Sequence, residues 1–266
     1  MKKVSWRIAA ITAGAALTSA AGIAQAQTYT NDFSGGLNGI TLTKSDLPVG
    51  DPNPGADIEG GTLRLTQAVN SQQNSAFLPQ LNPGQAIQSF RASFDHSISE
   101  GTCCGATPPN GPADGFSFAF GPTASGTFGE EGPGSGLVIS FDTWDNDDAP
   151  GAQEAPQIDI KVNGATIGTS ETSPFTAGAM VPVLVSLDPD GTLDMSYGGT
   201  LIFDELVTGF TPAVGDIFSF GARTGGANEV ARIDNLSVTT VVPEPATLGL
   251  LGIGALSLLA RRRRRA

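Results

Sequence analysis

Five acidic or amide residues follow one apolar segment in "GLVISFDTWDNDDAP", residues 136–150. The apolar run has the alternation of a β-strand, and the loop after it is rich in Asp, Asn and Pro. Carboxylates at the end of a buried strand are unfavourable unless a cation lies among them. A hard cation such as Ca²⁺ takes about six to eight oxygen ligands from carboxylates, amides, backbone carbonyls and water. One bend of this segment could supply several of them.

The same composition would also suit a solvated acidic turn, so the residues alone leave the two readings even. In the cation reading the candidate ligands are Asp142, the backbone carbonyl of Trp144, Asn146, and either Asp147 or Asp148. A zinc or redox site is disfavoured because the chain has only two cysteines, the adjacent Cys103 and Cys104, and one histidine. The two cysteines either form a vicinal disulfide, stay free or pair between chains.

The elements that must position this bend are short strands. Segments with period-2 alternation recur between Gly, Pro, Asn and Asp turns, a pattern typical of an all-β sandwich or barrel. The clearest are 61–67, 87–99, 115–121, 136–144, 156–169, 181–199, 216–224 and 231–242. Asn163-Gly164 predicts a type I′ hairpin, and "DPDG" at 188–191 predicts a second tight turn.

Eight phenylalanines fall at alternate positions of these segments and are predicted to form the core: Phe90, Phe94, Phe116, Phe118, Phe120, Phe141, Phe218 and Phe220. His96 lies in "FDHSIS", where we interpret it as a surface residue of a strand. We therefore expect one antiparallel β-sandwich over residues 27–241.

Both ends of the chain have the features of targeting signals. Residues 1–26 combine a basic start, an apolar stretch and a small-residue site, which predicts a secretory signal peptide cut after Ala26. Residues 242–266 contain Pro243-Glu244-Pro245, a short apolar run and five arginines. This order resembles the bacterial PEP-CTERM sorting signal, which implies export, transient membrane insertion of a short C-terminal helix, and processing by an exosortase-type enzyme near Pro243, Glu244 and Pro245. A plain C-terminal anchor is the alternative.

The body between these signals is strongly acidic. Residues 27–241 contain six Lys or Arg and 25 Asp or Glu. Such a charge repels nucleic-acid phosphates and anionic membrane surfaces, so no nucleic-acid partner is expected. It suits a soluble extracellular protein or one that binds cations.

Four segments in order resemble the L-type lectins, the family with the concanavalin A-like jelly-roll sandwich. They are "ADGFSFAFGP" at 113–122, "GTFGEEGPGSG" at 126–136, "ISFDTWDNDDAP" with "PQIDIKVNG", and "FSFGARTGGANEVARIDNLSV" at 218–238. The resemblance covers most of residues 114–238. It implies the jelly-roll fold, a carbohydrate ligand and a calcium ion.

The resemblance also implies roles for individual residues. Asp114 would follow a cis peptide bond and accept hydrogen bonds from sugar hydroxyls. The calcium ligands would be Asp142, the carbonyl of Trp144, Asn146 and Asp148. Further sugar contacts would come from Asn146, from the N–H of Gly136 or of Gly134, and from Thr224 and Gly225 in the last loop; Phe128 is a candidate aromatic platform.

Two departures limit what the resemblance implies. Legume lectins bind a transition metal through a Glu before the FDT motif and a later His, where this chain has Ser140 and Gln157. We therefore expect one calcium site and no transition metal. Ala231 or Arg232 stands near the place of another family histidine.

The sequence favours a surface or matrix lectin-like protein that binds a glycan or exopolysaccharide. The alternative is a structural protein of an exopolysaccharide or biofilm matrix that uses the same sandwich without a working sugar pocket. A glycoside hydrolase of this fold would need two carboxylates at alternate strand positions, and Ser140 and Gln157 stand where a catalytic Glu would be expected. We therefore do not expect an enzyme.

Overall fold

The computed structural model describes residues 25–45, 55–99, 101, 113–122, 124, 126–145 and 155–242. Within these ranges every regular element is a β-strand, and the strands belong to one compact unit. No helix in the described part is long and apolar enough to cross a membrane. The predicted signal peptide and C-terminal apolar helix, Cys103, Cys104 and Pro243-Glu244-Pro245 lie outside the described residues.

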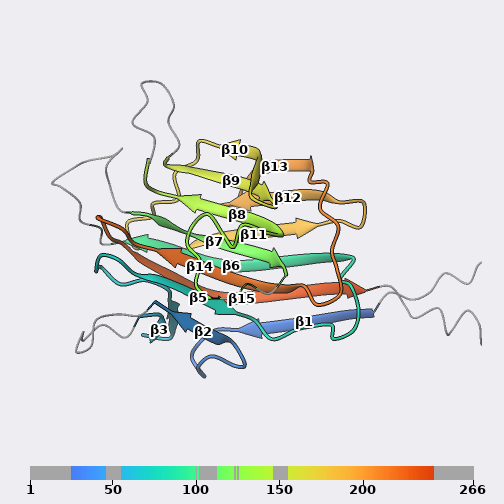
Figure 1. Ribbon diagram of the computed structural model, residues 1–266, viewed down its shortest axis with the longest axis horizontal. Helices are drawn as coiled ribbons and strands as arrows, with labels where there is room; N and C mark the ends of the chain where they lie inside the picture. The colour runs from blue at the N-terminus through green and yellow to red at the C-terminus, as the bar shows by residue number, and fades with distance from the viewer. Residues whose placement is uncertain are drawn as a thin grey trace, which may run out of the picture. The chain divides into compact units, whose positions relative to one another are not determined.

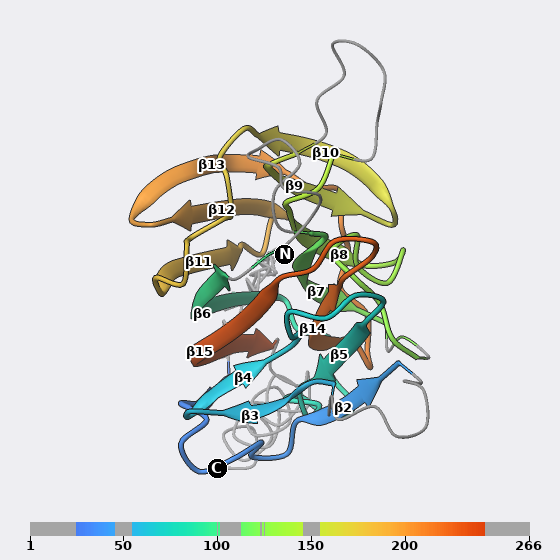
Figure 2. The same ribbon diagram turned by 90° about the vertical axis from the view of Figure 1, so that its left-hand side faces the viewer.

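Two antiparallel sheets face each other as two layers (Figures 1 and 2). The first sheet has the order β13-β12-β11-β6-β15-β4-β3, with β1 also paired to β15. Its strands are β1 (Gln25–Asn31), β3 (Asp57–Glu59), β4 (Thr62–Arg64), β6 (Ser89–Ser99), β11 (Val181–Leu187), β12 (Thr192–Tyr197), β13 (Thr200–Val207) and β15 (Val230–Val242).

The second sheet has the order β10-β9-β8-β7-β14-β5-β2. Its strands are β2 (Thr41–Lys44), β5 (Gln73–Phe77), β7 (Gly115–Gly121), β8 (Leu137–Asp142), β9 (Gln157–Val162), β10 (Ala165–Ser170) and β14 (Ile217–Arg223). The central strands β7 and β8 are buried along their whole length. The residues of β7 and β8 that point away from the core are buried too, so another segment of the protein must cover the outer face of the sheet there.

The predicted all-β sandwich is thus confirmed. Asn163 and Gly164 connect β9 to β10, and both have positive φ, as a type I′ turn requires. The "DPDG" turn connects β11 to β12. Strands β1, β2, β3, β5 and β13 were not among the clearest segments in the sequence; three of them are shorter than six residues.

The core consists of the inward residues of both sheets, and all eight phenylalanines predicted for it are buried. Phe116 stacks on Phe141 from the neighbouring strand with ring centroids 4.3 Å apart. Phe94 crosses to the opposite sheet and meets Phe220 edge-on at 5.1 Å. Such contacts between aromatic rings add to the burial of apolar area that stabilises the sandwich.

The interpretation of His96 as a surface residue is wrong. Its exposure is 0%, and its ring lies among Phe116, Phe141 and Tyr197. Nε2 is 3.0 Å from the Tyr197 hydroxyl. Burial lowers the pKa of His96 to about 3, so the ring is neutral at physiological pH. The reason is the alternation of β6, which places position 96 on the same face as Phe94.

Candidate functional site

The ends of three neighbouring central strands meet on one side of the seven-stranded sheet, where β7 begins and β8 and β14 end. Asp114 immediately precedes β7, Asp142 ends β8, and Arg223 ends β14. Gly115 is paired with Asp142 on one side and with Arg223 on the other. The register of the three central strands therefore brings together an acidic residue of the ADG segment, the first candidate ligand of the calcium bend, and a cation.

The backbone around Asp114 is fixed from both sides. The Ala113–Asp114 peptide bond is cis, as the lectin resemblance implies. The Asp114 N–H donates to the carbonyl of Arg223 at 3.0 Å, and the Asp114 carbonyl accepts from the N–H of Thr143 at 3.1 Å. Gly115 has φ 129°, and a Cβ there would lie 2.2 Å from the Phe141 carbonyl oxygen, so only glycine fits.

Arg223 joins two buried carboxylates. Its Nε atom is 2.7 Å from Oδ2 of Asp114, an ion-pair distance without hydrogen-bond geometry, and its Nη2 donates to Oε1 of Glu130 at 2.8 Å. Burial raises the pKa of Asp114, and the Arg223 charge partly opposes that rise. Asp114, 5% exposed, is thus already paired within the protein.

Glu130 is a residue of this site that the sequence did not reveal. Its exposure is 1%, Oε2 has no hydrogen-bond partner among the described residues, and burial raises its pKa to about 7. It lies in the loop 126–136, which covers the outer face of the sheet: Ser117 Oγ donates to the Gly129 carbonyl at 2.7 Å. A Cβ at Gly129 would lie 2.7 Å from Cβ of Arg223, so the glycine permits this close approach.

A pocket of about 530 Å³ opens beside this arrangement. Its lining includes Arg223, Glu130, Glu131, Gln73, Thr127 and Ser135. Glu131 forms an ion pair with Lys161, so charges of both signs lie around the pocket. Amide, hydroxyl and guanidinium groups in a hollow of this size can bind a polar ligand such as a sugar.

Asp142 has the character expected of a ligand to a cation. It is 5% exposed, and Oδ1 accepts the N–H of Trp144 at 2.9 Å, which closes the bend after β8. Burial raises its pKa to about 8, and the neighbouring Glu130 and Glu131 add to the rise. A buried carboxyl of this kind is stabilised by a bound cation.

The rest of the proposed ligand set is only partly visible. Asn146, Asp147 and Asp148 lie outside the described residues. Within the described ranges, no three His, Cys, Asp or Glu side chains are close enough to hold a metal ion. Of the ligands predicted from the sequence, only Asp142 and Trp144 lie within the described residues. Ser140 is fully buried and its Oγ has no hydrogen-bond partner among the described residues, and Gln157 donates to Asp159 at 3.1 Å.

Glu229, just before β15, is a second residue that the sequence did not reveal. It is 0% exposed, and its Oε2 accepts from Thr143 Oγ1 at 2.8 Å. Oε1 has no partner among the described residues. Burial raises the pKa of Glu229 to about 8, and the charges of Asp114, Glu130 and Asp142 contribute. Residues 143 and 229 are 86 positions apart, so no local pattern links them.

The structure does not bring Gly136 or Gly134 to Asp114. The Gly136 N–H donates to Oδ1 of Asn163 at 3.0 Å, and a Cβ at Gly136 would meet the end of β7 around Phe120 and Gly121. Asp114 lies at the other end of β7, which at about 3.3 Å per residue is about 20 Å away. The assignment of Gly136 as a sugar contact is therefore wrong, because the loop runs back along the strand before β8 begins.

The last loop is nearer to the expectation. A Cβ at Gly225 would lie 3.1 Å from Oδ2 of Asp114, so this glycine is beside the carboxylate. The hydroxyl of Thr224 instead donates to the Val69 carbonyl at 2.7 Å and accepts from Gln72, which leaves it a structural role. Phe128 is 5% exposed and packs edge-on against Phe77, so it is no open platform for a sugar ring.

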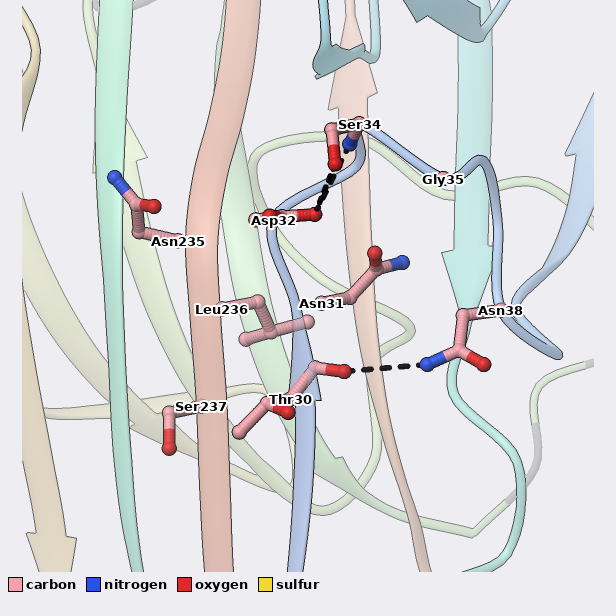
Figure 3. A pocket seen from close by; sticks show the side chains of 9 residues that line it. All are labelled: Thr30, Asn31, Asp32, Ser34, Gly35, Asn38, Asn235, Leu236 and Ser237. Atoms are coloured by element: carbon pink, nitrogen blue, oxygen red, sulfur yellow. Dashed lines mark hydrogen bonds between the residues drawn. The ribbon is translucent and has the colours of Figure 1, made fainter.

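A second polar hollow of about 570 Å³ lies along β1 and β15, away from Asp114 (Figure 3). Its side chains mostly satisfy one another. Oδ1 of Asp32 accepts from the Ser34 hydroxyl at 2.8 Å, and the Asn38 amide donates to the Thr30 carbonyl at 3.2 Å. No residue predicted for a site lines it.

Several solved structures have a similar fold. Basic winged bean lectin with Tn-antigen aligns with a TM-score of 0.61 and 20% identity over 83% of this chain and 100% of that chain. Lectin I-B4 of Griffonia simplicifolia, in a metal-free form, aligns with a TM-score of 0.56 and 18% identity over 81% of this chain and 99% of that chain. The VIP36 exoplasmic/lumenal domain, in a Ca²⁺/Man-bound form, aligns with a TM-score of 0.54 and 13% identity over 82% of this chain and 89% of that chain. The fold is therefore the L-type lectin jelly roll.

Residues 241–265 match the PEP-CTERM protein-sorting motif. No curated protein sequence matches the chain. The motif begins at the end of β15, where Val241 pairs with Ala26 of β1. The predicted signal-peptide cut after Ala26 would thus fall within β1 and leave the pairs from Gln27 onward.

Proposed function

We propose that this chain is an exported lectin-like protein that binds carbohydrate in the pocket beside Arg223 and Asp114. The observation that carries the proposal is that Asp114, Asp142 and Arg223 meet at the ends of three central strands of a lectin sandwich, next to a polar pocket. The similar solved structures support it, because winged bean lectin was solved with Tn-antigen and VIP36 in a Ca²⁺/Man-bound form. The role is binding rather than catalysis.

The chemistry suits neighbouring hydroxyls of a sugar. A hydroxyl group both donates and accepts hydrogen bonds. Arg223 engages Asp114 through Nε and Glu130 through Nη2, which leaves Nη1 to donate to a sugar oxygen. Oδ1 of Asp114 is the oxygen that would accept from a sugar hydroxyl. A neutral glycan is favoured, because the acidic body repels polyanions.

Calcium would occupy the bend after β8. Its ligands would be Asp142, the Trp144 carbonyl, Asn146 and Asp148. Its charge would balance the buried carboxyl groups nearby, those of Glu130 and Glu229 among them. Asp142 supports this assignment through its burial and raised pKa. The Ca²⁺-bound form of VIP36 shows that a protein of this fold can hold the ion. We propose no transition metal, since Ser140 and Gln157 offer no charged ligand.

A structural role in an exopolysaccharide or biofilm matrix is the second candidate. It is favoured by the ion pair of Arg223 with Asp114, which occupies the carboxylate that a sugar would use. In that case the pair would serve only to fasten the loop 126–136 over the sheet.

The termini define the route of the protein. A signal peptidase would cut after Ala26, and an exosortase-type enzyme would act near Pro243, Glu244 and Pro245, after transient membrane insertion of the apolar segment. The match to the sorting motif supports this route. The mature protein would then reside at the cell surface, in the outer envelope or in the extracellular matrix.

A glycan array probed with and without EDTA tests the function. The proposal expects binding to a subset of neutral glycans that EDTA removes and added Ca²⁺ restores. An absence of glycan binding in millimolar Ca²⁺ would favour the structural role. Binding that EDTA leaves unchanged would reject calcium dependence alone.

A further inference from the structure

We propose that Glu229 is a positioning residue for the calcium bend, acting through its hydrogen bond with Thr143. This inference rests on the calcium site of the proposed function. Glu229 belongs to none of the ligand or sugar-contact positions considered above. It is fully buried, it lies 86 positions from Thr143, and it accepts the Thr143 hydroxyl at 2.8 Å.

Thr143 stands between the two ligands that the structure describes, Asp142 and the carbonyl of Trp144. Two hydrogen bonds hold it. Its N–H donates to the Asp114 carbonyl at 3.1 Å, and its hydroxyl donates to Glu229. The backbone at 143 therefore has little freedom, and the orientation of the carbonyl and carboxylate on either side depends on it. Ligands held in place before a cation binds lose less conformational entropy on binding.

The backbone at Glu229 is held by Thr66, which follows β4 in the eight-stranded sheet. Thr66 Oγ1 donates to the Glu229 carbonyl at 3.0 Å and accepts from the N–H of Ala231 at 3.1 Å. Thr66, Glu229 and Ala231 are all 0% exposed. The Thr143 hydroxyl is thus anchored to the start of β15, which belongs to the other sheet of the sandwich.

The polar carboxyl of Glu229 argues against a purely space-filling role. A carboxyl buried beside three other acidic groups raises the free energy of the folded state, and Oε1 has no partner among the described residues. An apolar residue would fill the same volume without this cost. Among the described residues, the hydrogen bond from Thr143 is the contact of this side chain that compensates for the cost, and that bond reaches the bend.

The test is cation affinity, measured by titration with Tb³⁺ and followed by luminescence sensitised through Trp144, with Ca²⁺ as competitor. Thr143→Val removes the hydroxyl and keeps the shape, so affinity should fall about tenfold. Thr143→Ser restores the hydroxyl and should return affinity to within about twofold of wild type. A control is Thr240→Val, which removes a buried hydroxyl bonded to Asn82 at 2.6 Å; it should lower the melting temperature without changing affinity.

Glu229→Gln separates positioning from ligation, and it is the second test should Thr143→Val fail to fold. Its amide oxygen still accepts from Thr143, so affinity should stay within about threefold of wild type. Affinity in Thr143→Val equal to wild type, or a loss in Glu229→Gln as large as in Asp142→Asn, would overturn the inference. No Tb³⁺ or Ca²⁺ binding by wild type would instead overturn the calcium site itself, and the positioning role with it.

Discussion

In the calcium-free protein, burial disfavours the charged form of the Asp142 carboxyl. Its pKa is raised from 3.8 to about 8 by burial, so the folded state binds a proton more tightly than the unfolded state. The free energy of unfolding of the calcium-free protein should therefore rise as the pH falls through about 8 toward 4, and fall as the pH rises. A bound Ca²⁺ reverses this preference, because it favours the carboxylate.

Asp142→Asn tests this account. In EDTA at pH 9 the variant should melt above wild type by a few degrees, since it removes a buried charge and keeps an acceptor for the Trp144 N–H. Adding Ca²⁺ should raise the melting temperature of wild type and leave that of the variant nearly unchanged. Differential scanning calorimetry at pH 6 and pH 9 measures both. A variant that responds to Ca²⁺ as wild type does would remove Asp142 from the ligand set.

His96 predicts the opposite pH dependence. Its pKa is lowered from 6.5 to about 3, so the unfolded state takes up the proton first. The stability from the neutral ring is present above pH 6.5 and is lost as the pH falls toward 3. Between pH 6.5 and 4 this loss is at most about 3 kcal/mol, because each pKa unit corresponds to about 1.4 kcal/mol.

Urea unfolding of wild type and His96→Leu at pH 7 and pH 4 measures this effect. Wild type should lose more stability between the two pH values than His96→Leu, because the carboxyl groups contribute equally to both proteins. Equal losses would mean that His96 is not buried as a neutral ring. Tyr197→Phe is the matched control: it removes the 3.0 Å hydroxyl contact but keeps the histidine.

At the scale of elements, the loop 126–136 and strand β14 depend on one close approach. Gly129 has no room for a side chain against Arg223, although its backbone conformation would accept alanine. Gly129→Ala should therefore overpack the contact, at a cost of about 1–3 kcal/mol or roughly 2–10 °C in melting temperature, and should weaken glycan binding. Gly226→Ala is the control, since its Cβ would meet nothing within 4 Å; equal melting temperatures would refute the close contact.

Alternation predicted most of the central strands, because each has one face against the core: β7 and the two hairpins lie where the pattern placed them. The resemblance implied the cis peptide bond before Asp114, which the structure has. The ion pairs and hydrogen bonds of Arg223, Glu130 and Glu229 were not predicted, because contacts between residues 86 or more positions apart leave no periodic signal. Gly136 was misplaced because sequence does not show which glycine of a long loop turns toward the site. His96 was interpreted as a surface residue and is buried, although its spacing of two from Phe94 places both side chains on the inward face of β6.

At the scale of the whole molecule, the two ends of the body pair with each other. Gln27 pairs with Thr240 and Asn31 with Leu236, so the predicted new N-terminus lies beside the strand that leads into the sorting motif. Mass spectrometry of the exported protein should find Gln27 as the first residue and no Arg261–Arg265. Retention of the arginine block on exported protein would contradict the processing, and a first residue other than Gln27 would move the signal-peptide site.

The central claim is that Asp114 binds sugar beside a calcium site, at the start of a central strand of the lectin sandwich. The direct measurement is retention of wild type and Asp114→Asn on an immobilised neutral exopolysaccharide in millimolar Ca²⁺, with EDTA as the second condition. The substitution keeps the shape and removes the charge, and a hydrogen bond to a charged group contributes about 1.5–3 kcal/mol. Retention should therefore fall about tenfold or more in the variant, and wild type should lose it in EDTA. Equal, calcium-independent retention of the two proteins would contradict the claim and assign the sandwich a structural role.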